Sequence, residues 1–174
     1  MKIPTKNILL FLCAVCIFAG FVNTSCATPA AIKIRIMPIT AEASLYYFSP
    51  TEWLSKNNKN TMAKLDISYR SDEDNPVICN ISFFNTDKAP DSVTEIVLSG
   101  EGKDFPLNDV SVLIIKPENY ELRITSTLHI TELMELFESK TFSLKANIDG
   151  IVYQYDPHRD FYTFRNQFLD AFNL

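Results

Sequence analysis

Residues 62–84 read MAKLDISYRSDEDNPVICNISFF, and this stretch decides the fold class. Apolar side chains alternate with polar ones in both halves, and one side of the chain would carry Ala63, Leu65, Ile67 and Tyr69, then Val77, Cys79, Ile81 and Phe83. A repeat of two residues is typical of a β-strand that buries one face. The segment 71–76 between the halves, SDEDNP, is dense in residues that favour turns. The stretch therefore predicts two antiparallel strands joined by a turn.

The same reasoning predicts strands along most of the remaining chain. The candidate strands are residues 31–37, 42–48, 93–98, 110–116, 120–128, 142–148 and 151–155. Asp149-Gly150 lies between the last two and is a strong signal for a two-residue hairpin turn. Residues 110–116, VSVLIIK, are apolar almost throughout, which predicts a strand in the centre of the sheet.

Three short helices are expected as well. Residues 49–52 (SPTE) have the pattern of a capping box with proline at the first helical position, so a helix should run through Trp53 and Leu54. Residues 131–139 form a second candidate. Asp156-Pro157 should cap a final helix, whose apolar stripe would consist of Phe161, Phe164, Phe168, Leu169 and Phe172. We expect this stripe to cover a sheet face within the molecule, because a bare patch of that size would aggregate.

Eight or nine strands with two or three helices predict a single, mainly β domain over residues 31–174. The expected architecture is an antiparallel β-sandwich of the immunoglobulin-like kind, with short helices and a C-terminal helix. The alternative is an α+β fold in which the C-terminal helix packs on an antiparallel sheet. Residues 27–30 would form a short tether before the domain, too short to hold it far from a membrane.

The N-terminal residues have the features of an export signal. Lys2 and Lys6 form a basic start, and residues 8–22 read ILLFLCAVCIFAGFV without a charge. A membrane-spanning helix needs about 20 residues, so this run is short for a span and fits the apolar part of a secretory signal. An uncleaved membrane anchor is the alternative.

Cys26 ends this segment, and residues 1–26 resemble the signal of a bacterial lipoprotein. In that family a small residue precedes a cysteine, an aliphatic residue lies three or four positions before it, and the thiol carries a diacylglycerol. Ser25 and Val22 match these positions, whereas Asn23 departs from the stricter form of the pattern. The resemblance implies that Cys26 is lipidated, becomes the first residue of the mature protein, and is buried in a bilayer leaflet.

The position of Ala27 bears on localisation. Under the lipoprotein resemblance, Ala27 after the cysteine is compatible with sorting to the outer membrane, so the protein is expected in the cell envelope, at the outer membrane or cell surface rather than the inner membrane. The competing expectation is cleavage after Ala27, with Ser25 and Ala27 as the two small residues. That cleavage would give a secreted or periplasmic protein.

The charge balance argues against nucleic acid as a partner. The chain has 16 Lys and Arg and 21 Asp and Glu, a net charge of −5, and loss of Lys2 and Lys6 with the signal leaves −7. An acidic surface repels phosphate backbones, and the sequence shows no basic cluster. The partners expected are a membrane, through the lipid, and another envelope protein.

Few side chains suggest a metal site. His129 and Glu132 have the i, i+3 spacing of metal ligands, with Glu135 nearby, but zinc needs three or four ligands and no further one is apparent. A solvated surface is the expectation there. The acidic turn Asp72, Glu73 and Asp74 lacks the glycine and distal glutamate of a calcium loop, so a solvated hairpin tip is expected. No metal or cofactor site is assigned.

Catalytic candidates are equally sparse. His158 lies between Asp156 and Asp160, but no nucleophile motif accompanies these residues, so helix capping is expected. Cys79 falls on an apolar strand face and is expected to be a buried, inert thiol without a disulfide. The aromatic clusters, Tyr46, Tyr47, Phe48 and Trp53 and then Tyr153, Tyr155, Phe161, Tyr162 and Phe164, are expected to pack in the core, a binding surface being the alternative.

These observations favour a non-enzymatic, lipid-anchored envelope protein of a bacterium whose β domain binds another protein or a surface ligand. Two alternatives remain open. One is a secreted or periplasmic hydrolase with a dispersed site formed by Asp156, His158 and Asp160. The other is a structural subunit of an envelope assembly in which exposed sheet edges pair with neighbours.

Overall fold

The computed structural model describes residues 34–57, 59–72, 76–85, 91–116, 118 and 121–172. These residues belong to one compact unit, Ile32–Leu174. The expected signal, the tether and Cys26 therefore lie outside the described residues, as do Glu73 and Asp74. Within the described part of the chain, no helix combines the length and the apolar character needed to cross a membrane.

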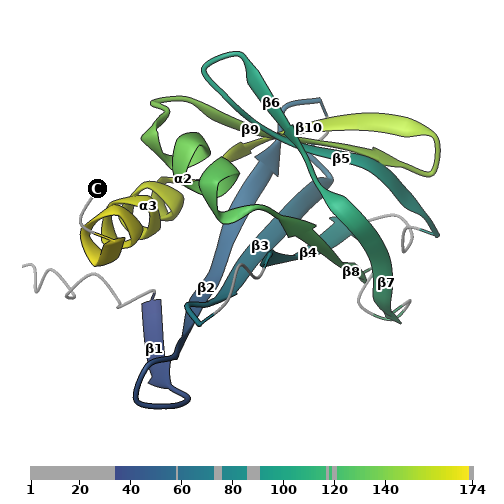
Figure 1. The fold of residues 1–174 in the computed structure, drawn as a ribbon. Helices are drawn as coiled ribbons and strands as arrows, with labels where there is room; N and C mark the ends of the chain where they lie inside the picture. Colours follow the sequence, from purple (N-terminus) through teal and green to yellow (C-terminus); the bar gives the residue numbers. More distant parts are fainter. Residues whose placement is uncertain are drawn as a thin grey trace, which may run out of the picture. The chain divides into compact units, whose positions relative to one another are not determined.

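Ten strands and two helices make up the described ranges (Figure 1). In chain order they are β1 (Ile34–Pro38), β2 (Ser44–Ser55), β3 (Thr61–Arg70), β4 (Val77–Asn85), β5 (Val93–Gly100), β6 (Lys103–Pro106), β7 (Asn108–Lys116), β8 (Glu121–Leu128), α2 (Ile130–Glu138), β9 (Phe142–Ile148), β10 (Ile151–Pro157) and α3 (Arg159–Phe172). The prediction of a mainly β domain with a C-terminal helix is confirmed.

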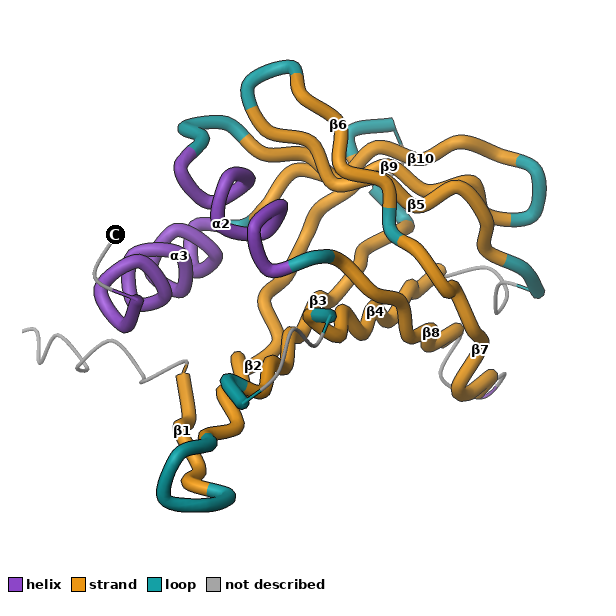
Figure 2. The backbone as a smooth tube through the Cα atoms, viewed as in Figure 1, coloured by secondary structure: helices purple, strands orange, loops and turns teal. Residues whose placement is uncertain are grey.

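The strands form one antiparallel sheet in the order β6-β5-β9-β10-β2-β3-β4-β8-β7, with β1 paired to β2 beside this path. The terminal strands β6 and β7 are separated in sequence by Leu107 alone. The sheet must therefore curl until its two ends approach each other, and Figure 2 shows this nearly closed barrel with both helices at one end. The immunoglobulin-like sandwich is not confirmed, because all the strands belong to one continuous sheet instead of two stacked ones.

The β3–β4 pair has the predicted register. Ala63 lies opposite Phe83 and Ile67 lies opposite Cys79, and the predicted apolar side is buried from Ala63 to Ile67 and from Val77 to Phe83. The Asp149-Gly150 turn is also confirmed, with φ of 51° and 81°, the left-handed values that a twisted two-residue hairpin requires. A similar turn joins β5 to the short strand β6, which the sequence reasoning does not predict.

The helix predicted at residues 49–52 is wrong, because these residues lie within β2. The pairing of β2 with β3 shifts register between Phe48 and Thr51, so Pro50 sits at an irregularity where a strand tolerates a residue without an N–H. Trp53 is buried, and its indole Nε1–H donates to Thr51 Oγ1 at 3.2 Å. Burial of Thr51 and Trp53 in the core thus outweighs the local capping pattern.

The C-terminal helix covers the inner face of the sheet, as predicted for its aromatic stripe. Phe164 and Phe168 each lie 5.2 Å, centroid to centroid, from Phe48 of β2, and Phe161 lies 4.8 Å from Trp53. The predicted capping by Asp156-Pro157 is wrong, because β10 continues through Pro157. Residues 156 and 157 pair with β2, and this pairing delays the start of the helix to Arg159.

Strand β1 is confirmed over Ile34–Pro38, but its predicted half-buried face is confirmed only at Ile34 and is wrong at Ile36. Ile36 and Met37 are both exposed, although they point to opposite sides of the strand. β1 pairs with the first half of β2 only, at the end of the molecule away from most of the core. Ile34 is partly buried and packs against the core, and the end of α3 contacts this part of the sheet through Phe172 and Tyr46, but this cover does not bury Ile36.

Cys79 is a free thiol and is fully buried, which confirms the prediction of a small core residue. On the inner face it lies between Ile67 of β3 and Ser126 of β8, and Ser126 Oγ donates to its backbone carbonyl at 3.1 Å. Burial raises the pKa of the thiol from 9.0 to about 12, with a smaller contribution from the negative charge of Asp66. The folded protein therefore keeps this thiol protonated and unreactive.

This pKa predicts a loss of stability in alkaline solution. Between pH 9 and about 12 the unfolded chain releases the Cys79 proton while the folded chain retains it. The free energy of unfolding of the wild type should therefore fall by about 1 kcal/mol, relative to that of Cys79→Ala, as the pH rises from 8 to 10. Urea unfolding of both proteins at the two pH values measures this difference, and parallel pH dependences would contradict the assignment.

Candidate interaction surface

Strand β7 carries the most exposed apolar side chains of any strand in the sheet's main path. Val110, Val112, Leu113 and Ile115 are each between 36% and 51% exposed. We call these four residues the β7 edge. Single exposed apolar residues are common on protein surfaces, but a run of them along one strand marks an interaction site or an aggregation hazard.

The position of β7 explains this exposure. The predicted central position of residues 110–116 is wrong, because β7 is the last strand of the sheet and, in the described part of the chain, pairs only with β8. Val112 and Ile115 lie opposite Ile124 and Leu122, whose side chains are buried. Both faces of the strand are apolar as in a covered strand, yet one of its two edges has no neighbouring strand.

Two irregularities interrupt the β7–β8 pairing. The register shifts between Asn108 and Ser111 and again between Val112 and Ile114. Asp109 has a φ of 51°, and its carboxylate accepts a hydrogen bond from Thr127 Oγ1 at 2.9 Å. Bulges of this kind twist an edge strand away from flat pairing, so they restrict which strands can add to β7.

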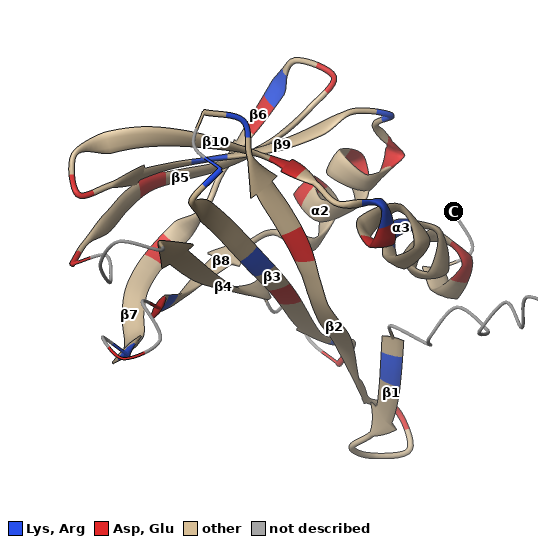
Figure 3. Ribbon diagram, turned by 180° about the vertical axis from the view of Figure 1, so that it is seen from behind, with Lys and Arg blue, Asp and Glu red and all other residues tan. Residues whose placement is uncertain are grey.

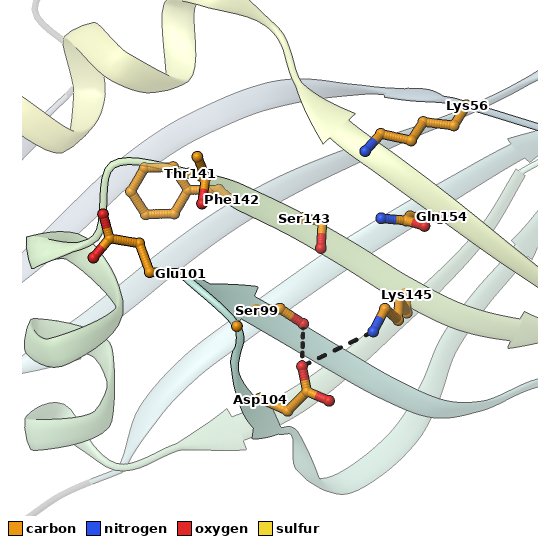
Figure 4. A pocket seen from close by; sticks show the side chains of 10 residues that line it. Lys56, Ser99, Glu101, Asp104, Thr141, Phe142, Ser143, Lys145 and Gln154 are labelled. Atoms are coloured by element: carbon orange, nitrogen blue, oxygen red, sulfur yellow. Dashed lines mark hydrogen bonds and ion pairs between the residues drawn. The ribbon is translucent and has the colours of Figure 1, made fainter.

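A polar hollow of about 340 Å³ lies over β5, β9 and β10 (Figure 4). Two lysines and two carboxylates line it, together with small polar side chains: Lys56, Lys145, Glu101, Asp104, Ser99, Thr141, Ser143 and Gln154. Asp104 accepts a hydrogen bond from Ser99 Oγ at 2.6 Å and lies 3.9 Å from Lys145 Nζ. Lys56 pairs with Asp156 at 2.9 Å. The lysines are thus neutralised by nearby carboxylates, and the hollow offers no concentrated charge to a ligand.

Comparison with protein families, curated proteins and solved structures finds no match for this chain.

The predicted metal-like pair His129 and Glu132 forms the N-terminal cap of α2. His129 Nδ1 accepts a hydrogen bond from the Thr131 N–H at 3.4 Å, and Glu132 accepts one from the His129 N–H at 3.1 Å. Both side chains therefore satisfy backbone groups at the helix start. Glu135 pairs with Lys103 at 2.5 Å and takes no part in this cap. Across the described residues, no three His, Cys, Asp or Glu side chains are grouped to hold a metal ion.

The three residues of the possible hydrolase site are only partly brought together. His158 Nδ1 lies 2.9 Å from Asp160 Oδ1 at the start of α3. Asp156 instead forms the ion pair with Lys56. The His158 N–H donates to the Glu52 carbonyl at 2.8 Å, and its own carbonyl accepts from the Phe161 N–H at 3.0 Å. The backbone of His158 therefore joins the end of β10 to the helix.

The remaining predicted features have structural roles. Asp72 forms an ion pair with Arg70 at 2.5 Å, and hydrogen bonding to this guanidinium lowers the pKa of Asp72. Core packing is confirmed for six of the aromatic residues that formed the predicted clusters, namely Phe48, Trp53, Tyr153, Tyr155, Phe161 and Phe164. Tyr162 is an exception, because it is exposed.

Sequence reasoning missed a polar network on the outer face of β3, β4 and β8. Asp66 is 2% exposed, and its carboxylate accepts hydrogen bonds from Asn80 at 2.9 Å and Arg123 at 2.6 Å. Arg123 also donates to Ser82 at 2.9 Å. Asp66 and Arg123 both fall at predicted outward positions of their strands. Their contact could be found only by knowing that β4 lies between β3 and β8.

Removing Arg123 should destabilise the fold. Arg123→Met leaves the buried Asp66 carboxylate with one neutral donor, and we expect the free energy of unfolding to fall by about 2–3 kcal/mol. The matched control is Lys64→Met, which breaks the exposed 3.5 Å pair with Glu52 and should change stability by less than about 1 kcal/mol. Urea unfolding measures the free energy of unfolding of both variants. Equal decreases in the two variants would show that the Asp66–Arg123 pair stabilises the fold no more than an exposed ion pair does.

Proposed function

We propose that this chain is a lipid-anchored bacterial envelope protein that acts by binding another envelope protein, not by catalysis. The lipoprotein-like segment ending at Cys26 supports the anchor. The β7 edge supports the binding role. The polar hollow and the His158–Asp160 pair support an enzymatic role less well, because their charges already have partners in the described structure.

The observation that supports the binding proposal is that a strongly apolar strand, β7, lies at the end of the sheet. Residues 110–116 have the composition of a strand covered on both sides, but in the described part of the chain β7 has one neighbouring strand, and the four side chains of the β7 edge are 36–51% exposed. An extended segment of a partner that pairs with β7 would satisfy free backbone groups and cover these side chains. Because these side chains are already about half buried, burying the remainder of each adds roughly 0.5–1.5 kcal/mol before the cost of association.

The partner expected is an extended, mainly apolar segment of a different protein, because β7 presents its apolar run without a central charge. Asp109 and Lys116 bound this run, and both already interact with β8, through Thr127 and Glu121 respectively. Charge is therefore not the main basis of recognition. Specificity would come from the two bulges, which limit the length of regular pairing.

The anchor is tested in the native host with radiolabelled palmitate. The wild type should incorporate the label and lose its first 25 residues, whereas Cys26→Ser should do neither. Intact-mass measurement of the mature protein locates the new N-terminus. Unchanged label and cleavage in Cys26→Ser would refute lipidation, and a mature chain that begins after Ala27 would support a secreted or periplasmic protein instead.

The binding surface is tested with a charge placed on the β7 edge. Leu113→Lys should abolish copurification of a specific envelope protein with the tagged full-length chain, because a buried, unpaired lysine opposes strand addition. Val152→Lys is the matched control, since Val152 is an equally accessible apolar residue on β10. Circular dichroism verifies that both variants fold.

Three results would count against this surface. The first is a partner that copurifies equally with both variants. The second is a partner lost with both. The third is a wild type that elutes as a dimer and becomes monomeric in Leu113→Lys, which would assign the β7 edge to a second copy of this chain.

A further inference from the structure

The hairpin formed by β1 and β2 has an apolar outer end that the proposed binding role does not use. Ile36, Met37 and Ile39 are between 45% and 54% exposed, and we call these three residues the hairpin tip. Ile36 and Met37 lie at the end of β1, and Ile39 lies in the loop that follows, where the Ala43 carbonyl accepts hydrogen bonds from the N–H groups of Ile39 at 2.8 Å and Thr40 at 3.2 Å. The tip is thus a fixed apolar projection.

The apolar surface continues from the tip along the outer face of the sheet. Met37 lies opposite Leu45, and Leu45 lies opposite Arg70. Leu45 helps to line a mainly apolar hollow of about 200 Å³ together with Pro76 and Ile78. Ile78 is exposed as well. Met37 and this hollow therefore lie on the same face of the sheet, whereas Ile36 projects from the opposite face.

Charge is sparse at this end of the hairpin. Among residues 34–43 only Arg35 and Glu42 are charged, and Figure 3 shows one basic band on β1 and one acidic position in the loop. The chain without its signal has a net charge of −7. An acidic surface is repelled by anionic lipid headgroups, so the locally neutral hairpin is one of the few parts suited to lie against a bilayer.

The hairpin is also the described part closest in sequence to Cys26. Eight peptide steps separate Cys26 from Ile34, which gives a reach of at most about 29 Å. Five residues at about 3.3 Å each place Ile39 about 17 Å beyond Ile34 along β1. A chain anchored at Cys26 therefore holds β1 within about 29 Å of the anchor, and this tether is long enough to let the tip turn toward the bilayer.

We propose that the hairpin tip inserts into the lipid surface to which Cys26 is attached. This inference rests on the proposed anchoring of Cys26. The acyl chains would hold the protein on the membrane, and burial of Ile36, Met37 and Ile39 at the boundary between headgroups and acyl chains would fix its orientation. The β7 edge would then remain available to a partner.

The test places an environment-sensitive fluorophore on the tip of the full-length, acylated protein. Ile39→Cys is labelled in protein purified from the native host, where Cys79 is buried and Cys26 is acylated. The protein is reconstituted in phosphatidylcholine vesicles with or without brominated acyl chains. Fluorescence should increase several-fold on reconstitution and be quenched by the brominated lipid, because the tip contacts acyl chains.

Val152→Cys is the matched control, because Val152 is 58% exposed on a different hairpin. Its label should show neither the increase nor the quenching. An unquenched label at residue 39 in protein that incorporates palmitate would overturn the tip insertion while leaving the anchor intact. Equal quenching at both positions would also overturn it. Failure of palmitate incorporation would instead refute the anchor, and the inference with it.

Discussion

The structure depends on how one end of a curled sheet is filled with aromatic rings. The sheet nearly closes on itself, and α3 lies against its inner face with Phe161, Phe164 and Phe168. Phe137 of α2 packs edge-to-face against all three rings. Each such pair contributes about 0.5–1.5 kcal/mol beyond the area it buries. The packing of the two helices therefore fills one end of the sheet and stabilises the curvature of β2 and β10.

The sequence predicted the features that depend on near neighbours. Alternation along residues 62–84 gave both the β3–β4 pair and its buried side, and Asp149-Gly150 gave the hairpin turn. Features decided by distant neighbours were missed. Residues 49–52 have the local signals of a helix start, but Trp53 is buried against Phe161, far along the chain. At this point the burial of Trp53 in the core outweighs the local preference of residues 49–52 for a helix start.

The interaction surface was missed for the same reason. The composition of residues 110–116 correctly indicated a strand with two apolar faces, yet only the strand order shows that β7 lies at the end of the sheet. The Asp66–Arg123 contact likewise needs the position of β4 between β3 and β8. The composition of a strand thus indicates which of its faces tend to be buried. The order of the strands in the sheet shows whether a neighbour in the same chain buries them.

The two bulges of β7 have a consequence for the size of any complex formed there. A flat edge of identical strands can add copies without limit, which is how fibrils grow. On β7 the spacing of backbone donors and acceptors changes twice within nine residues. A visiting strand can match only part of that spacing, so regular pairing along this edge would be short. The bulges therefore disfavour the repeated, in-register addition of strands by which a polymer grows.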